Sequence, residues 1–112
     1  MKLEYDDKFI YLVDCRSFFS RFMGFMFKKK IDYALLFNKC NSIHTFFMKN
    51  NIDVIMCDKS NKILYYYNDL SKNKIIWPKK GVYKTIELPV SYFNINIGEM
   101  IRIKYDVEDK FN

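Results

Sequence analysis

The stretch CNSIHTFFMKNNIDVIMCDKSNKIL, residues 40–64, decides the fold, because its apolar runs are short and polar residues separate them. Ile43–Phe47 and Asp53–Cys57 have the length and the β-branched or aromatic content of strands. We expect Lys49–Asn51 to form the tip of a β-hairpin in which His44 lies opposite Met56. The stretch therefore predicts antiparallel β-structure, and it also holds the only histidine of the chain.

Most of the remaining chain continues this pattern. Asp58–Asn61 is a predicted turn that joins Asp53–Cys57 and Lys62–Tyr67 as a hairpin. Asn68–Gly81 is a predicted long exposed loop in which Ile75–Trp77 is the apolar anchor. Ser17–Phe27 differs, because its apolar residues recur at helical spacing, and Gly24 is expected to end or kink the helix. The other predicted elements are strands at Phe9–Val13, Tyr33–Phe37, Lys62–Tyr67, Tyr83–Leu88 and Met100–Tyr105, and a helical turn at Val90–Asn96.

Together these elements predict a mainly β fold with about seven strands and one or two short helices. The sequence shows no internal repeat and no alternation of strands with helices, so we expect a small antiparallel barrel or rolled sheet. An α+β fold is the alternative. With 112 residues, half of them hydrophobic, the chain is expected to form one domain over residues 1–112.

The formal charge of +6 favours encounters with phosphate, anionic lipid or acidic proteins. The excess comes from lysine, with the tightest run at Lys28–Lys30, whereas the chain has only three arginines, Arg16, Arg21 and Arg102. Base-reading surfaces depend on arginine, so the sequence gives no strong nucleic-acid signal. The aromatic face of the predicted helix beside these lysines also suits a membrane-surface anchor, but we expect it to cover the core.

Cys15, Cys40 and Cys57 are scattered and form no CxxC pair, so neither a disulfide framework nor a metal site is predicted, and no cofactor is expected. The N-terminal sequence MKLEYDDKFI has acids where a signal peptide needs an apolar core, and no stretch is apolar enough to span a membrane. We therefore expect a cytoplasmic protein, or one held peripherally at the inner face of the membrane.

Several segments, in order, resemble one family. RFMGFM at Arg21–Met26 resembles an Arg-x-x-Gly segment, and the central segment from Cys40 to Asp58, with His44 and Met48, is similar to a Cys-x-Ser-Ile-His-Thr-Phe-x-Met pattern. The weaker matches are Trp77-Pro78, Glu87-Leu88-Pro89 and Ile97-Gly98-Glu99. Over about residues 9–104 the chain resembles the domain-of-unknown-function family 192. The departures are Phe25, Lys28, Ile86 and Glu99, which keep size or charge.

The resemblance implies a compact, mostly β domain without an established reaction. In this family many members neighbour pilus or secretion genes, so the resemblance also implies a partner from a pilus, secretion or cell-envelope system. Structural roles are expected for the motif residues Arg21, Gly24, Met48, Glu87, Pro89 and Gly98.

The candidate functional residues are His44, Thr45, Asp53, Asp58 and Trp77. A functional interpretation gives His44 a proton-transfer or ligand-holding role, with Asp53 or Asp58 orienting it. The structural alternative makes His44 a hydrogen-bonded side chain of the sheet and gives Thr45 and Asp53 bonds to the backbone. Trp77, beside Pro78 and two lysines, suits either partner binding or a lid over the barrel mouth.

These observations favour a non-enzymatic binding or accessory domain that uses a barrel mouth bordered by His44, Asp53 and Trp77. The first alternative is a hydrolase-like enzyme in which His44 acts with a carboxylate or a cysteine, which requires contact within about 3.2 Å. The second alternative is binding of an anionic surface through the lysines.

Overall fold

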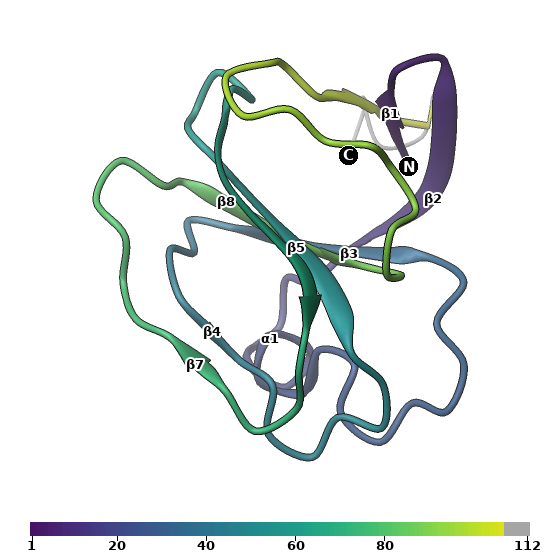
Figure 1. The fold of residues 1–112 in the computed structure, drawn as a ribbon, viewed down its shortest axis with the longest axis vertical. Helices are drawn as coiled ribbons and strands as arrows, with labels where there is room; N and C mark the ends of the chain where they lie inside the picture. Colours follow the sequence, from purple (N-terminus) through teal and green to yellow (C-terminus); the bar gives the residue numbers. More distant parts are fainter. Residues whose placement is uncertain (107–112) are drawn as a thin grey trace.

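The computed structural model describes residues 1–106 and shows a curled β-sheet with a short helix and a second small sheet below it (Figure 1). The strands are β1 (Lys2–Tyr5), β2 (Lys8–Asp14), β3 (Ala34–Asn38), β4 (Ile43–His44), β5 (Ile52–Cys57), β6 (Ile63–Leu70), β7 (Ile75–Ile76), β8 (Lys84–Leu88) and β9 (Arg102–Lys104), and the helix is α1 (Phe18–Met23). The prediction of a mainly β fold is confirmed.

Seven strands form the main sheet in the order β6-β5-β8-β3-β2-β1-β9, and β4 pairs with β7 in the small sheet. The main sheet curls so far that Lys62, before β6, bridges Met100, before β9. Next to this bridge, the N–H of Ile63 donates to the carbonyl of Glu99 at 2.9 Å, and the N–H of Gly98 donates to the carbonyl of Ile63 at 2.9 Å. The two edges therefore meet at one end, and the sheet forms a half-barrel.

β5 lies at the centre of the fold and is buried on both faces, which is why its sequence IDVIMC does not alternate between apolar and polar residues. Ile55 and Cys57 belong to a core inside the curl, together with residues of β1, β2 and β8. Val54 and Met56 belong to a second core on the other face of the sheet, which also contains Phe25 after α1 and Ile76 of β7. This second core supports the candidate site described below.

The expected hairpin with its tip at Lys49–Asn51 is wrong. His44 pairs with Ile75 of β7, not with Met56, and β5 pairs instead with β6 and β8. The strand expected to reach Phe47 ends at His44, and the chain then turns at Phe47, which has a left-handed φ of 61°. Since β5 needs a hydrogen-bonded partner on each side, the two longer strands take these positions.

Other expectations need smaller corrections. β2 and β3 are parallel, although no strand–helix–strand unit was expected; residues 15–33 are long enough for the crossover and contain α1. In the segment expected to be a loop, β6 continues to Leu70 and β7 forms at Ile75–Ile76. Ile76 is buried, whereas Trp77 is 69% exposed, so Ile76 is the anchor. The helical turn expected at Val90–Asn96 is absent, because the segment makes a turn and a bend and then runs on without regular structure.

Candidate functional site

Strand β8 carries an acidic side chain, Glu87, into the second core. Because side chains alternate along a strand, Ile86 and Leu88 face the core inside the curl, and Glu87 faces the opposite side. Its neighbours across the sheet are Leu35 on β3 and Val54 on β5, both apolar and buried. Glu87 is therefore only 3% exposed in apolar surroundings.

This burial changes the chemistry of the carboxyl group. Desolvation raises the pKa of Glu87 to about 8, and a hydrogen bond from the backbone of Phe25 only partly opposes the rise. The group is thus mostly protonated at neutral pH. Its Oε1 atom is the one buried side-chain oxygen or nitrogen among the described residues without a hydrogen-bond partner. Such orphaned atoms are uncommon in folded proteins.

The end of helix α1 brings the backbone against this carboxyl group. Ser17 caps the start of the helix by accepting a hydrogen bond from the N–H of Ser20, and Gly24 ends it with a φ of 49° and a ψ of −127°. A Cβ atom at position 24 would lie 3.0 Å from Oε1 of Glu87 and 3.3 Å from Oε2. Glycine is therefore required here both for its backbone conformation and for this close approach.

A pocket of about 110 Å³ opens in front of Glu87. This volume holds about four water molecules or one small functional group. The pocket is lined by Arg21, Phe22, Met23, Gly24, Phe37, Cys40, Ser42, Ile43, His44, Met48 and Glu87. The structure thus brings together residues from three sequence segments that carry the family resemblance.

His44 is part of the lining of this pocket. Its Nδ1 accepts a hydrogen bond from the N–H of Phe46 at 3.2 Å, so in the neutral ring the proton is on Nε2. The ring lies between Phe46, at a centroid distance of 5.3 Å, and Phe22, at 5.5 Å, which fixes its orientation. The Cys40 thiol, also in the lining, donates to the carbonyl of Ser42 at 3.1 Å.

Arg21 contributes the positive charge of the pocket lining. Within residues 1–106, no side-chain hydrogen bond or ion pair occupies its guanidinium group. Burial raises the pKa of the nearby Cys15 thiol to about 11, the charge of Glu87 adds to this rise, and the charge of Arg21 opposes it. Arg21 and Glu87 thus line one pocket and both influence the same thiol.

His44 is also shared with a wider groove. This open groove of about 470 Å³ is lined by Ser42, Ile43, His44, Phe46, Ile75, Ile76, Trp77 and Pro78. Two of the candidates from the sequence, His44 and Trp77, thus border one concave surface. The third, Asp53, does not belong to it.

Asp53 lies on β5, where its carboxylate holds other segments in place. The hydroxyl of Tyr66 donates to it at 2.5 Å and the side-chain amide of Asn68 at 3.0 Å. The backbone N–H groups of Asp69 and Ser91 donate at 2.8 and 2.9 Å. Desolvation, followed by the hydrogen bond to Asp53, raises the pKa of Tyr66 to about 12. This network joins β5, the end of β6 and the segment after β8.

Thr45 and Asp58 also bond to the backbone. The Thr45 hydroxyl donates to the carbonyl of Ser71 at 2.9 Å and accepts from the N–H of Lys74 at 2.8 Å, which ties the loop after β6 to the loop after β4. Asp58 accepts from the N–H groups of Ser60 and Lys62 at 2.8 and 3.0 Å and so closes the predicted turn.

Two motif residues lie at turns away from the pocket. The carbonyl of Pro89, directly after β8, accepts a hydrogen bond from the N–H of Tyr92 at 3.3 Å. Gly98 has a φ of 92° and lies where the sheet edges meet, with open space around its Cα. Its role is therefore conformational freedom, not close approach.

From the sequence we expected a structural role for Glu87 and did not expect its raised pKa. The available signal was its place in KTIEL, where strand alternation puts Thr85 and Glu87 on one face. An acid on the inner face of a strand is uncommon, but the sequence did not reveal that β8 is covered on both faces.

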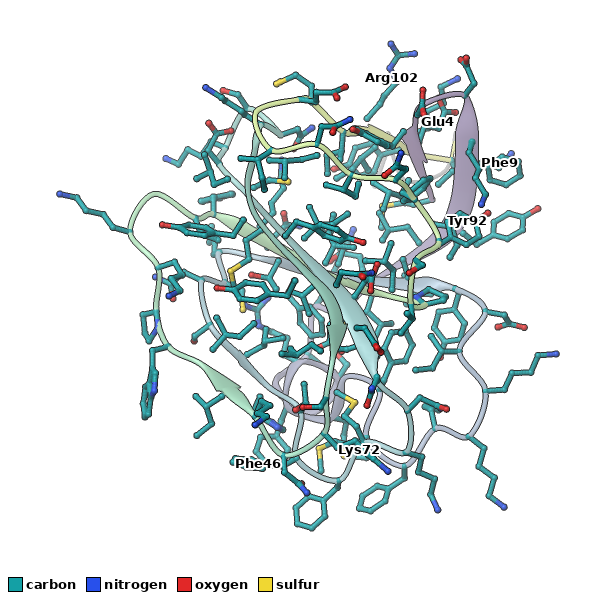
Figure 2. The ribbon with its side chains drawn as sticks, viewed as in Figure 1. Glu4, Phe9, Phe46, Lys72, Tyr92 and Arg102 are labelled. Carbon is teal, nitrogen blue, oxygen red and sulfur yellow. The ribbon has the colours of Figure 1, made fainter. Side chains whose placement is uncertain are left out.

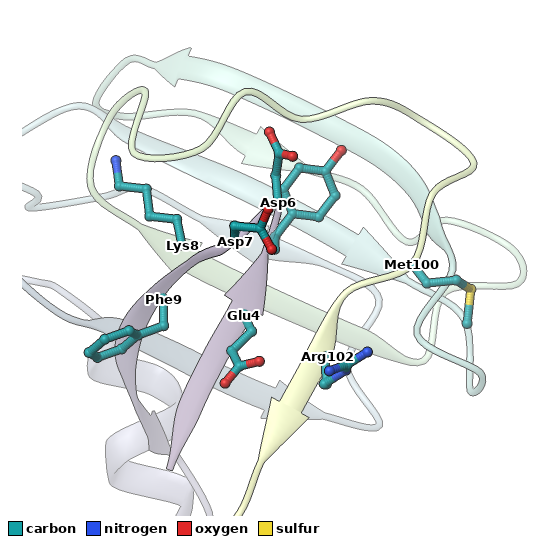
Figure 3. Close-up of a pocket in the computed structure, with 8 residues that line it drawn as sticks. Glu4, Asp6, Asp7, Lys8, Phe9, Met100 and Arg102 are labelled. Carbon is teal, nitrogen blue, oxygen red and sulfur yellow. The ribbon is translucent and has the colours of Figure 1, made fainter.

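A separate hollow, of about 480 Å³, lies beside the β1–β2 hairpin (Figure 3). Asp6 and Asp7 form the hairpin tip, and Glu4 lies between Phe9 and Arg102 in the view of Figure 3. The hollow differs from the Glu87 pocket because none of its described residues has a buried polar side-chain atom without a partner.

Within residues 1–106, no group of three or more histidine, cysteine, aspartate or glutamate residues has the geometry to hold a metal ion. No helix in this part of the chain is long and apolar enough to cross a membrane.

Residues 2–103 match the model of the family DUF192, described as Uncharacterized ACR, COG1430. The chain is 37% identical over 106 residues to a UPF0127 protein of Thermococcus sibiricus, and 33% identical over 101 residues to a UPF0127 protein of Thermococcus gammatolerans. Each match covers 84% of this chain and 65% of the relative. The chain thus spans about 65% of the length of these relatives.

Two solved structures are similar in fold. One, a protein of unknown function from Novosphingobium aromaticivorans, has a TM-score of 0.74 and 10% identity, with coverage of 91% of this chain and 82% of that chain. The other, a Sinorhizobium meliloti protein described as a candidate transcription regulator, has a TM-score of 0.75 and 12% identity, with coverage of 90% and 89%. At these identities the likeness concerns the fold alone.

Proposed function

The chain belongs to the DUF192 family, and we propose that it is a binding module whose ligand is a small acceptor-rich group, such as a carboxylate, held in the Glu87 pocket. The observation that carries this proposal is the orphaned Oε1 of Glu87, a buried polar atom in a pocket that motif residues line. A hydrogen bond between a ligand and this oxygen is stronger in the protein interior than in water, because the local dielectric constant is lower.

The polar groups around the pocket decide the class of ligand. Glu87 is protonated at neutral pH and donates through its O–H, His44 donates through Nε2–H, and Arg21 donates through its guanidinium group. Three donors favour an acceptor, and the positive charge of Arg21 favours a negative one. Because the pocket has only about 110 Å³, the ligand is a small anion or the end group of a larger molecule.

The pKa of Glu87 gives this proposal a specific pH dependence. Below pH 8 the carboxyl group is neutral and donates to the anion, whereas above pH 8 it is ionised and repels the anion. Binding of an anion is therefore strong at low pH and is lost as the pH rises through about 8. A cationic ligand would show the opposite dependence.

The experiment compares three probes of similar size and different charge: acetate, acetamide and methylammonium. Two-dimensional NMR follows the backbone amides of Gly24 and Phe25, which adjoin the carboxyl group. We expect acetate to shift both amides at pH 6.5 and to lose its effect at pH 9, and Arg21→Leu to weaken acetate binding. Arg102→Leu, at the hollow of Figure 3, is the matched control. Absence of shifts with all three probes, or methylammonium binding that strengthens above pH 8, would contradict the proposal.

The hydrolase-like alternative has some support, because His44, Cys40 and a protonated Glu87 line one pocket. It needs direct contact between His44 and a carboxylate or thiol. The hydrogen bonds of these side chains instead join His44 to Phe46 and Cys40 to Ser42. Binding is thus the function that the geometry supports better.

A partner from a pilus, secretion or cell-envelope system stays a prediction from the family resemblance. Affinity capture from cells with the chain and with Arg21→Leu tests it, since a partner that uses the pocket is captured by the unmodified chain alone.

A further inference from the structure

Two exposed phenylalanines form a rigid pair at the end of the molecule below the main sheet. The rings of Phe27 and Phe47 stack at a centroid distance of 5.7 Å and an angle of 26°, and the two residues are 55% and 64% exposed. Their loops are joined by a β-bridge between Met26 and Met48 and by a hydrogen bond of 3.0 Å from the N–H of Phe27 to the carbonyl of Phe47. Both methionines are buried, so the core holds the loops while the rings face solvent.

The backbone at these two residues is unusual. Phe27 has a φ of 63° and Phe47 a φ of 61°, in the left-handed region where bulky residues are rare. Glycine or asparagine would fit both positions with less strain, and neither ring contributes to the buried cores. Apart from their contact with each other, the two rings thus add nothing to the buried cores, and a contact outside the chain gives phenylalanine at both positions a reason.

Lysines surround this pair. Lys28, Lys29 and Lys30 follow Phe27, and the side chain of Asn50 fixes their loop by donating to the carbonyls of Lys28 and Lys29 at 3.1 and 3.0 Å. All three lysines are exposed. The loop with these three lysines is thus held next to the rings of Phe27 and Phe47.

The loop after β6 adds to the same surface, because Thr45 ties it to the segment that contains Phe46 and Phe47. Figure 2 shows Phe46 and Lys72 near one another at this end of the molecule. We call the surface the Phe/Lys rim and define it by Phe27, Phe46, Phe47, Lys28, Lys29, Lys30, Lys49, Lys72 and Lys74. The neighbouring exposed acids are Asp32 and Asp69, so positive charge predominates.

We infer that the Phe/Lys rim docks the protein on a lipid bilayer with anionic headgroups. Exposed aromatic rings insert at the boundary between headgroups and acyl chains, and lysines beside them attract anionic lipid. The rim contains no arginine, which argues against nucleic acid, where arginine forks read bases and stack. Charge complementarity thus selects the lipid surface as the occupant.

Docking in this way also orients the Glu87 pocket. Phe46 belongs to the rim and also lines the groove with His44, which is a wall of the pocket. The pocket and groove are therefore presented close to the lipid surface. Docking through the rim does not depend on what the pocket binds.

The test is sedimentation with vesicles of phosphatidylcholine alone or mixed with phosphatidylglycerol. We expect binding to the mixed vesicles only, and a loss of roughly tenfold or more in the double variant Phe27→Asn and Phe47→Asn. Asparagine tolerates a positive φ, so this variant removes the rings without adding backbone strain. The matched control is Phe9→Thr with Tyr11→Thr, which removes two exposed rings from β2 and leaves binding unchanged.

A second comparison tests whether vesicle binding depends on the lysines of the rim or on the overall positive charge of the protein. Changing Lys28, Lys29 and Lys30 to glutamine removes three charges from the rim, and changing Lys59, Lys62 and Lys80 to glutamine removes three exposed charges elsewhere. We expect only the first triple variant to lose binding. Equal losses in both, unchanged binding in the Phe27 and Phe47 variant, absence of binding to the mixed vesicles, or retention by RNA in place of vesicles would each overturn the inference.

Tryptophan fluorescence tests whether the rim inserts into the bilayer. With Trp77→Phe as background, Phe47→Trp leaves one tryptophan in the chain, at the rim. We expect its emission to shift to the blue with mixed vesicles, and an unchanged spectrum would contradict insertion.

Discussion

Replacing Glu87 by glutamine should stabilise the protein at neutral pH and remove most of its pH dependence between about pH 5 and 8. Glutamine has the shape of the protonated carboxyl group and cannot ionise. The folded protein holds the Glu87 proton up to a pKa of about 8, whereas the unfolded chain releases it near 4.5. Between these values the folded state binds more protons, so stability is fully present below pH 4.5 and is lost as the pH rises.

The magnitude follows from the same two values. Each pH unit between 4.5 and 8 costs about 1.4 kcal/mol, so ionisable Glu87 lowers the free energy of unfolding by about 3 kcal/mol at pH 7 and by about 5 kcal/mol above pH 8. Small domains have only about 5–15 kcal/mol in total, so the effect is large.

Urea denaturation at several pH values, without added anions, measures this effect. We expect the unmodified chain and Glu87→Gln to unfold at similar urea concentrations near pH 4.5 and to diverge steadily up to pH 8. Glu99→Gln, at an exposed position, is the control and should follow the unmodified chain. Parallel curves for the unmodified chain and Glu87→Gln would refute the reasoning.

Two further predictions concern stability. Gly24→Ala should lower the free energy of unfolding by roughly 1–3 kcal/mol in urea denaturation, because Cβ would meet the Glu87 carboxyl at 3.0 Å and φ is 49°; unchanged stability would show that this close approach does not matter. Asp53→Asn should cost roughly 2–4 kcal/mol, because it removes the charge that accepts four donors, among them the N–H of Ser91 at 2.9 Å. Asp58→Asn is its control, since asparagine can accept the same two turn bonds; equal losses at both positions would contradict the role given to Asp53.

Local patterns in the sequence were enough to predict a mainly β fold and the end of α1. Gly24 ends the helix as expected, and Asp58 closes the turn before β6 as its residue type predicts. Only one partner of β5 was predictable: the turn at Asp58–Asn61 predicts its hairpin with β6, which the structure confirms, whereas local patterns do not predict its pairing with β8. Only the tertiary fold shows that it lies between β6 and β8.

The candidate site was predictable in part for a similar reason. His44 stood out as the only histidine of the chain, and the structure places it in the pocket lining. Asp53 was grouped with it because the two are close in sequence, but Asp53 faces the other side of the sheet and accepts hydrogen bonds from Tyr66 and Asn68. Glu87 lies far from His44 in the sequence, and its raised pKa depends on burial that only the packed sheet supplies.

The most direct test of the account is the pKa of Glu87 in the folded protein, measured by following the side-chain carboxyl carbon in ¹³C NMR over a pH titration and assigned by comparison with Glu87→Gln. A midpoint near 8 is the predicted result. A midpoint in the ordinary range of glutamate, about 4 to 5, would mean that this carboxyl group is ionised and solvated, and the pocket would then lack the neutral donor on which its proposed ligand depends.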